Sequence, residues 1–300
     1  MSGNRLRFTK EYIEGKEKMK NSSLSICSIV RDCEINLKNN IPRIELLRTL
    51  FKDSEVIVFE NDSKDNTLEV LRKWESRSSK INIFSEILNS STIPTNSIEH
   101  GNRYFSKYRI GKMATFRNKY LHFLNNNGIK RDYVIIIDLD ISNFDIDGIV
   151  HSFGTQTPWD CISANGTSLS SRFVKQYHDS YALIESGKLN DIQTELTIRL
   201  NRIRYSALKT GQVLLEVDSA FGGLAVYKWE SIKDLYYSCL DNNDVRVQCK
   251  SEHVGLHKMM KDKGHNNIYI NPSLNVKYRS ITLSFLISKA KEKFKIHKLN

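Results

Sequence analysis

Asp138 and Asp140 are the residues whose types and spacing most directly suggest chemistry. They follow residues 133–137, a short aromatic and β-branched run that predicts a strand buried on both faces. Two carboxylates at the end of such a strand are costly unless a cation neutralises them. Mg²⁺ and Mn²⁺ take carboxylate oxygens and keep positions for water and substrate phosphates. The pattern predicts a metal and diphosphate site, with a plain turn after the strand as the alternative.

The apolar periodicity predicts that strands and helices alternate along the first half of the chain. Pro42 falls in the first turn of one predicted helix, where proline is tolerated. This order favours a mainly parallel sheet with crossover helices, in which ligands bind outside the carboxyl ends of the strands. The predicted strands are 24–30, 55–60, 81–84 and 133–137, and the predicted helices are 41–51, 68–74 and 110–124.

Three further polar residues, Arg31, Glu60 and Asp62, lie at or just beyond the carboxyl ends of predicted strands. Because Asp138 and Asp140 end another strand of the same sheet, all five side chains are expected near one edge. This agreement in position weighs more than any single residue.

Arg117 lies on the predicted helix 110–124, shortly before the Asp-x-Asp strand. A guanidinium close to a metal site can hold a phosphate through paired hydrogen bonds. The alternative is an arginine on the helix surface, which is the commoner position for this residue type.

The second half of the chain gives weaker patterns. Residues 159–166 predict a strand that ends in a turn, and residues 214–227 predict two short strands around Gly222 and Gly223. Paired glycines allow the backbone to approach a ligand or another strand, and a simple turn or bulge is an equal alternative. Two further segments are predicted, an inserted basic helical segment at 186–212 and a closing strand at 268–272.

A helix is predicted to begin at Ser251, which suits the N-cap position, with Glu252 in the first turn, where its charge suits the helix dipole. Glu252 is a candidate base for a hydroxyl group, and His253 or His257 is a candidate third metal ligand. The simpler interpretation, which the residues alone favour, is capping by Ser251 with both histidines in solvent.

The chain has 300 residues, 40% hydrophobic and 26% charged, with 4 prolines, which suits a large α/β domain with ample core. Its formal charge of +11 suggests nucleic acid, an anionic membrane or a phosphorylated substrate as partner. The basic residues are spread along the chain rather than interleaved with aromatics, so no nucleic acid is expected. Five cysteines without CxxC spacing predict reduced thiols in a cytoplasmic setting.

The two ends of the chain differ from the rest. Residues 1–20 are charged and predict a solvated, partly helical lead-in without a signal peptide. Residues 281–298 predict a basic amphipathic helix, which can lie on the inner face of an anionic membrane or pack one face on the domain. No apolar run is long enough to span a membrane. We expect a lead-in at 1–20, a domain at 21–280 with halves 21–145 and 146–280, and a C-terminal helix at 281–300.

Taken together, these motifs resemble the GT-A glycosyltransferases. Residues 60–67 resemble the acidic-Asn-x-Ser-x-Asp-x-Thr segment that follows their second strand, and residues 109–121 resemble their helix with an Arg-Asn pair. Residues 138–140 match their Asp-x-Asp motif. The order of motifs is most similar to the capsule mannosyltransferase-like group of fungi and its relatives in bacteria and viruses, where a segment like residues 178–182 follows. The resemblance covers residues 24–272.

This resemblance implies a GT-A, Rossmann-like fold, with a mixed, mainly parallel sheet and two closely packed halves in a single domain. It also implies metal-dependent transfer of a hexose, with mannose as the first expectation, from a nucleotide-diphosphate sugar to a glycan or lipid-linked hydroxyl in polysaccharide biosynthesis. Asp138 and Asp140 would hold Mn²⁺ or Mg²⁺ and the donor diphosphate, and the metal would neutralise charge on the leaving group.

The resemblance also assigns roles to the other candidates. Glu252 would act as the base if the reaction inverts the anomeric configuration, and would orient substrate if it retains that configuration. Asp218 would help to shape the donor-sugar and acceptor pocket. The expected donor-binding residues are Arg31, Glu60, Asp62, Arg117, Gly222 and Gly223.

Two other classes of function compete with sugar transfer. A nucleotidyltransferase also uses a nucleotide-binding α/β domain and paired carboxylates, but the loop at residues 31–34 lacks the glycines typical of that class. A non-catalytic module that binds anionic membranes or polysaccharide would not depend on Asp138 or Asp140 for ligand binding.

Overall fold

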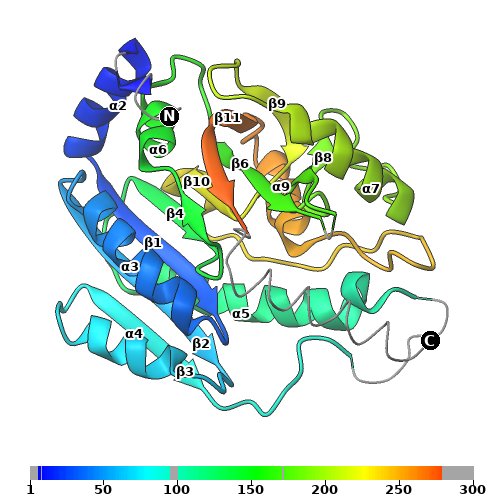
Figure 1. Ribbon diagram of the computed structural model, residues 1–300, viewed down its shortest axis with the longest axis horizontal. Helices are drawn as coiled ribbons and strands as arrows, with labels where there is room; N and C mark the ends of the chain where they lie inside the picture. Colours follow the sequence, from blue (N-terminus) through cyan, green and yellow to red (C-terminus); the bar gives the residue numbers. More distant parts are fainter. Residues whose placement is uncertain (1–5, 8, 95–100, 171, 279–300) are drawn as a thin grey trace.

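The computed structural model describes residues 6–7, 9–94, 101–170 and 172–278. Their strands form one mixed sheet in the order β3-β2-β1-β4-β10-β6-β11-β9-β8, with β5 beside β11 and β7 beside β6 (Figure 1). Strands β3, β2, β1 and β4 are parallel, and β10 runs antiparallel between β4 and β6. The mainly parallel α/β fold predicted from the sequence is therefore confirmed.

The first half alternates strands and helices as predicted. Its elements are α2 (Lys10–Lys20), β1 (Ser23–Val30), α3 (Glu34–Arg48), β2 (Asp53–Asn61), α4 (Thr67–Glu75), β3 (Ile81–Glu86), η1 (Arg103–Phe105), α5 (Lys107–Asn126) and β4 (Tyr133–Ile137).

Helix α3 begins one residue after Cys33, so Pro42 lies in its interior and not in its first turn. The prediction was wrong because residues 34–40 are mostly polar and resemble a loop. These polar residues have a structural task, since the Asn40 side chain donates to the carbonyl groups of Leu139 (3.2 Å) and Ile141 (2.8 Å). The start of α3 thus holds the turn that carries the Asp-x-Asp motif.

The second half completes the same sheet. Its elements are β5 (Asn143–Phe144), α6 (Ile146–Gly154), β6 (Cys161–Leu169), β7 (Lys175–Tyr177), β8 (Ile184–Glu185), α7 (Glu195–Arg204), η2 (Tyr205–Ala207), β9 (Leu215–Ser219), β10 (Leu224–Lys228), α8 (Trp229–Ile232), α9 (Glu252–Asp262) and β11 (Ile268–Lys277).

The strands on either side of Gly222 and Gly223 are present but do not pair with each other. β9 pairs with β11 and β8, whereas β10 pairs with β4 and β6. Because β10 joins β4 of the first half to β6 of the second, the proposed division near residue 145 separates two parts of one sheet.

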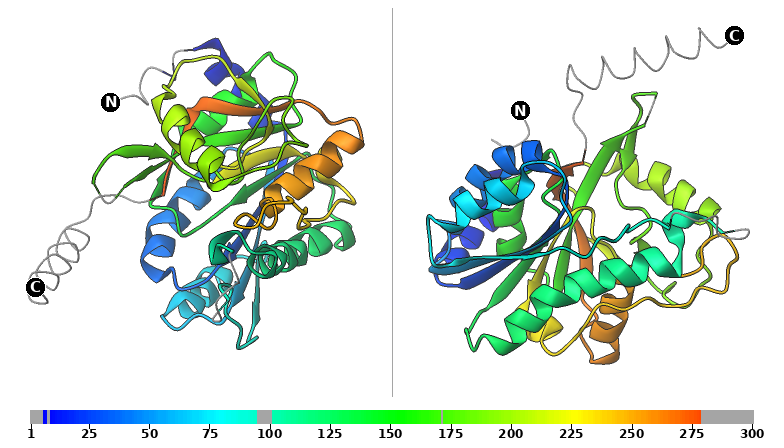
Figure 2. Two further views of the ribbon diagram at one scale, coloured as in Figure 1. Left: turned by 90° about the vertical axis from the view of Figure 1, so that its right-hand side faces the viewer. Right: turned by 90° about the horizontal axis from the view of Figure 1, so that it is seen from below.

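Strand β4 is buried on both faces, as predicted. Tyr133, Ile135 and Ile137 belong to the core formed with α3, α4 and α6, and Val134 and Ile136 to the core formed with α5, α8 and α9. The right-hand view of Figure 2 shows α3, α4 and α6 on one side of the sheet and α5 and α9 on the other. The alternation follows from the two-residue period of a strand.

The two termini were predicted to lie outside the domain. Within the described residues, helix α2 packs on α6, so residues 10–20 are in contact with the domain. A Cβ added at Gly15 would lie 1.9 Å from the Val150 carbonyl oxygen, and one at Gly154 would meet the Glu11 carbonyl. The predicted C-terminal helix 281–298 lies outside the described residues. Within the described residues, no helix is long and apolar enough to cross a membrane.

The contact between α2 and α6 makes a prediction about stability. Gly15→Ala should lower the free energy of unfolding by about 1–3 kcal/mol, because the new methyl meets backbone and cannot rotate away. Gly111→Ala is the matched control, since its Cβ would have no neighbour within 4 Å. It should be neutral or stabilising by up to about 1 kcal/mol, as expected for alanine in a helix. Urea denaturation measures both, and equal effects would contradict this packing.

Candidate active site

Asp138 and Asp140 lie directly after β4, at the carboxyl edge of the parallel strands. The Asp138 backbone N–H donates to the Gly223 carbonyl (3.0 Å), which fixes the turn against the start of β10. Together with Asn40 of α3, this bond holds the turn from two sides. The two carboxylates therefore sit on a supported turn rather than on a free loop.

A cleft of about 380 Å³ opens beside these two aspartates. Arg31 and Asp32 line it from the end of β1, and Met113 and Phe116 line it from α5. Its remaining lining residues are Ile29, Val30, Asn61, Thr92, Asp138 and Asp140. The structure thus brings the ends of β1, β2 and β4 together, as the sequence predicted.

Glu60 and Asp62 do not line this cleft themselves, and their carboxylates instead hold the segments beside it. Glu60 accepts hydrogen bonds from the Ser63 backbone N–H (2.9 Å) and the Ser85 hydroxyl (2.5 Å). Asp62 accepts from the backbone N–H groups of residues 88–90, and Arg31 donates to the Ser90 carbonyl (2.9 Å). Desolvation opposes ionisation of Asp62, but hydrogen bonds from Asn61 and these N–H groups lower its pKa to about 2.

Arg117 is buried, with only 2% of its surface exposed, so the alternative of a surface arginine is wrong. Its Nη2 donates to Asp138 (2.9 Å) and its Nε donates to Glu252 (3.0 Å). The guanidinium also lies over the rings of Phe221 (5.1 Å) and Tyr237 (5.8 Å). Its Nη1 has no partner among the described residues. One cation thus joins α5, β4 and α9.

The structure also corrects the simpler interpretation of the α9 start. Ser251 occupies the N-cap position, but its side chain makes no capping hydrogen bond. Glu252 is buried and faces Arg117, and His253 is buried and stacked on Phe221 with ring centroids 3.8 Å apart. Burial, followed by the charges of Arg117 and His257, lowers the pKa of His253 well below its usual value.

His257 does not join the two aspartates. Its Nδ1 lies 2.8 Å from the Ser219 hydroxyl and its Nε2 lies 3.0 Å from the Tyr227 hydroxyl. Among the described residues, no group of three or more His, Cys, Asp or Glu side chains could hold a metal ion. The Ser219 and Tyr227 hydroxyls thus engage both ring nitrogens of His257 inside the core.

Asp218 and the paired glycines have structural partners. The Asp218 carboxylate forms an ion pair with Lys261 and accepts from the Leu189 backbone N–H (2.8 Å). Gly222 and Gly223 have φ values of +65° and +89°, and a Cβ at Gly222 would lie 2.3 Å from the Ala164 carbonyl oxygen. The glycines thus permit the close approach of the chain to β6.

Sequence reasoning missed Asp179 as a site residue. It adopts a left-handed φ of +63°, and burial, followed by the charges of Glu252 and Asp138, raises its pKa to about 8. The only sequence signal was its place in the segment 178–182. Tyr278 was missed too, because β11 was predicted to end at residue 272. It bonds to the Asp140 side chain, and the His178 ring stacks on it with centroids 4.0 Å apart.

The site holds more carboxylates than cations. Asp138, Asp179 and Glu252 surround the Arg117 guanidinium closely enough to influence one another's charge. Burial raises the pKa of Asp138. Asp140 stands at the exposed rim, yet the loss of water around its carboxyl, followed by the Asp138 charge, raises its pKa to about 6. An added cation would relieve this repulsion.

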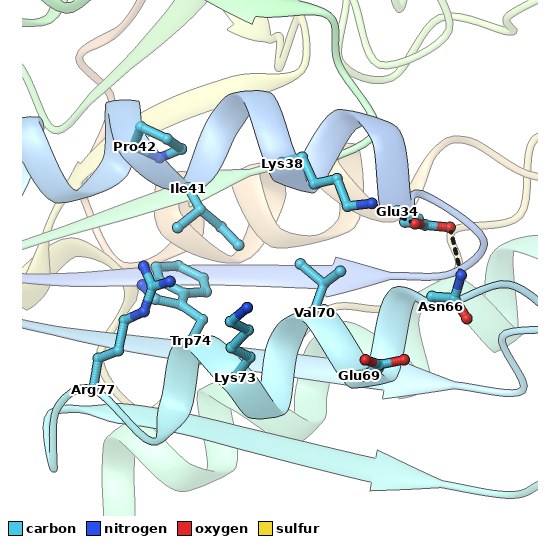
Figure 3. Close-up of a pocket in the computed structure, with 10 residues that line it drawn as sticks. All are labelled: Glu34, Lys38, Ile41, Pro42, Asn66, Glu69, Val70, Lys73, Trp74 and Arg77. Carbon is cyan, nitrogen blue, oxygen red and sulfur yellow. Dashed lines mark hydrogen bonds and ion pairs between the residues drawn. The ribbon is translucent and has the colours of Figure 1, made fainter.

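A second and larger hollow, of about 470 Å³, lies between α3 and α4 (Figure 3). Ile41, Val70 and Trp74 line it, and Lys38 and Lys73 lie along it. None of the residues predicted to bind metal or donor lines this hollow. The smaller cleft, which Asp138 and Asp140 line, is therefore the candidate site.

The parallel sheet, the cleft at its carboxyl edge and the Asp-x-Asp turn define a GT-A type, Rossmann-like α/β protein. A family model described as cryptococcal mannosyltransferase 1 matches residues 25–297, and the chain belongs to this family. The protein is thus a member of a glycosyltransferase family. No curated protein sequence matches the chain.

Three of the solved structures that are similar to this chain are the following. The mannosyltransferase PcManGT from Pyrobaculum calidifontis, determined with GDP-Man and Mn²⁺, has 12% identity and a TM-score of 0.46 over 92% of this chain and 66% of its own. TarS from S. aureus has 14% identity and a TM-score of 0.44 over 85% and 59%. The chain thus spans two thirds or less of these two proteins. Glucosyl-3-phosphoglycerate synthase from Mycobacterium tuberculosis, determined with Mn²⁺ and UDP, has 15% identity and a TM-score of 0.45 over 93% and 80%.

The buried Arg117 should be coupled to Glu252. Arg117→Met leaves two acidic partners without their cation, and should lower the free energy of unfolding by about 3–5 kcal/mol. Adding Glu252→Gln should recover part of that loss, because one of the unpaired charges is removed. Urea denaturation of the single and double variants measures this coupling. Strictly additive losses would show that the two side chains do not interact.

The buried His257 should make stability depend on pH. Burial, followed by the Lys261 charge, lowers its pKa from 6.5 to about 3, so the folded protein holds it neutral. The stability that the neutral His257 contributes is fully present above pH 6.5 and is lost as the pH falls towards 3. By about pH 4.5 the loss amounts to about 2–3 kcal/mol. His257→Gln should remove this part of the acid destabilisation in urea titrations at several pH values. Parallel pH profiles for both proteins would refute it.

Proposed function

We propose that the protein transfers a hexose, with mannose as the first candidate, from a nucleotide-diphosphate sugar to a hydroxyl group of a glycan or lipid-linked acceptor. The observation that carries this proposal is the pair Asp138 and Asp140 at the mouth of the cleft, with Asp138 bound to the buried Arg117. Family membership supports sugar transfer, and the donor and acceptor are our inference.

A divalent cation fits the donor set of this site. Asp138 and Asp140 offer hard oxygen ligands beside the cleft, and burial is the main cause that raises the pKa of each. A divalent cation would favour the charged form of both carboxyls. Mg²⁺ and Mn²⁺ commonly use one or two carboxylates together with substrate phosphates, so no third protein ligand is required. When bound, the metal would offset the charge of the leaving nucleoside diphosphate.

The donor would lie along the wall formed by the ends of β1 and β2. Arg31 lines the cleft and supplies a cation for a phosphate, and Glu60 and Asp62 hold the loop that closes its side. Arg117 would act mainly by fixing the Asp138 carboxylate. Its Nη1, which is buried and has no partner in the part of the chain that the structure describes, would be a further donor for an oxygen of the bound substrate.

Glu252 and Asp179 would have different roles on the acceptor side. The ion pair with Arg117 makes Glu252 a positioning residue rather than the base. Asp179 forms no ion pair with a residue that the structure describes, and its carboxyl responds to the charges of Asp138 and Glu252. It is therefore our candidate for contact with the acceptor hydroxyl. Asp218, bound to Lys261, would shape the far wall.

The test is thermal unfolding with Mn²⁺ and UDP, GDP, CDP or dTDP. One diphosphate should stabilise the protein only when metal is present, by about 2.7 kcal/mol at roughly 100 times its Kd. Asp140→Asn should abolish the effect while the protein stays folded, because a carboxylate ligand is lost. Asp234→Asn, an exposed aspartate outside the cleft lining, is the matched control and should behave as the parent. Stabilisation without metal, or retained by Asp140→Asn, would overturn the proposal.

A further inference from the structure

Helix α7 turns an apolar stripe towards solvent. Leu196, Leu200 and Ile203 are 63%, 50% and 58% exposed, and their spacing of four and three residues places them on one face. Ile198, on the opposite side of the helix, is buried and packs into the protein. An amphipathic helix normally hides its apolar stripe, whereas α7 is anchored by a single isoleucine and shows the larger stripe outwards.

Most of the exposed charges beside this stripe are basic, and Asp191, which lines the same hollow as Leu200, is the acidic exception. Arg199 and Arg202 are exposed and form no ion pair with any residue in the described ranges. The acidic residue of the helix, Glu195, is already engaged with Arg246 (2.8 Å) and Asn102. Arg204 pairs with Glu185 at the other end. Arg199 and Arg202 together outweigh Asp191, so the surplus charge on this face is positive.

The hairpin of β6 and β7 adds a second element of the same character. Val174 near its tip is 59% exposed, and the neighbouring Arg172 and Lys175 are exposed and basic. Strand β7 packs against α7, and the hairpin stands out from the body of the molecule in both views of Figure 2. Exposed apolar side chains next to basic ones thus occur both on α7 and on the adjoining β6–β7 hairpin.

This surface lies at the edge of the sheet where the cleft opens. Ala225 of β10 pairs with Ile136 of β4 on one side and with Ser163 of β6 on the other. β6 and β4 are therefore parallel and level, and β6 continues beyond the level of Asp138 to Leu169. The hairpin consequently projects past the Asp-x-Asp turn on the same side of the molecule.

We infer that α7 and the tip of the β6–β7 hairpin form a docking surface for an anionic lipid bilayer. Leucine, isoleucine and valine side chains can enter the boundary between headgroups and acyl chains, while the arginines extend to the phosphates. Each basic residue near an anionic surface adds attraction that salt weakens. This docking surface does not depend on the activity proposed above. It also consists of residues other than 281–298, on which the sequence-based expectation of membrane contact rested.

The experiment is sedimentation of the full chain with vesicles of phosphatidylcholine, with or without phosphatidylglycerol. The parent should bind only the anionic vesicles, and less at high salt. Leu196→Ser/Leu200→Ser/Ile203→Ser should weaken binding at least about tenfold, because apolar surface no longer enters the bilayer. Arg199→Gln/Arg202→Gln should weaken it roughly fivefold per arginine. Circular dichroism checks that both variants remain folded.

Matched controls test whether any exposed apolar or basic residue has the same effect. Ile35→Ser/Leu46→Ser removes side chains of α3 that are 73% and 57% exposed, and Lys16→Gln/Lys20→Gln removes two exposed charges of α2. Both should bind as the parent. Every variant retains residues 281–300, so differences between them report on the docking surface alone.

A fluorescent side chain on α7 tests directly whether this face enters the bilayer. Tryptophan fluorescence of Leu196→Trp should shift to the blue on anionic vesicles and be quenched by brominated lipid. Unchanged binding by the serine variant, or no quenching, would overturn the proposal. Another outcome would equally overturn the proposal and assign the face to a second copy of the chain. In that outcome the parent does not bind vesicles but self-associates in light scattering, and the serine variant no longer self-associates.

Discussion

The arrangement of the site depends on one buried cation. The Arg117 guanidinium bonds to Asp138 at the end of β4 and to Glu252 at the start of α9. Residues 117, 138 and 252 are far apart in sequence, and each would be costly to bury alone. Their mutual neutralisation permits a polar centre beneath the cleft. It also fixes one Asp138 oxygen while the side chain remains partly open to the cleft.

Supporting elements hold the same turn through backbone contacts. Asn40 binds the carbonyls of residues 139 and 141, and Gly223 accepts the Asp138 N–H group. Gly223 can reach this position because Gly222 approaches β6 more closely than a side chain would allow. The Asp-x-Asp turn is thus fixed by a helix, an antiparallel strand and an ion pair, which favours a preformed site.

Local patterns predicted the strands and the carboxyl-edge residues, because the strand period and the alternation of strands and helices along the chain can be read from short stretches of sequence. They did not predict that Arg117 is buried, since a guanidinium becomes buried only when distant carboxylates reach it. The polar start of α3 was missed for a similar reason, as Asn40 finds its partners about a hundred residues later. His257 and Asp218 looked like site residues, yet the structure gives both of them partners inside the fold, and their roles remain proposals.

The placement of β10 has a consequence for synthesis of the chain. β4 pairs with β1 on one side, and its other edge is covered only by β10, which begins at Leu224. While a ribosome makes the intervening residues, a strand of five apolar residues therefore has one open edge. Such an edge can pair with another nascent chain. The helices that pack on this strand, and the carboxylates at its end, would then also reduce aggregation before the sheet is complete.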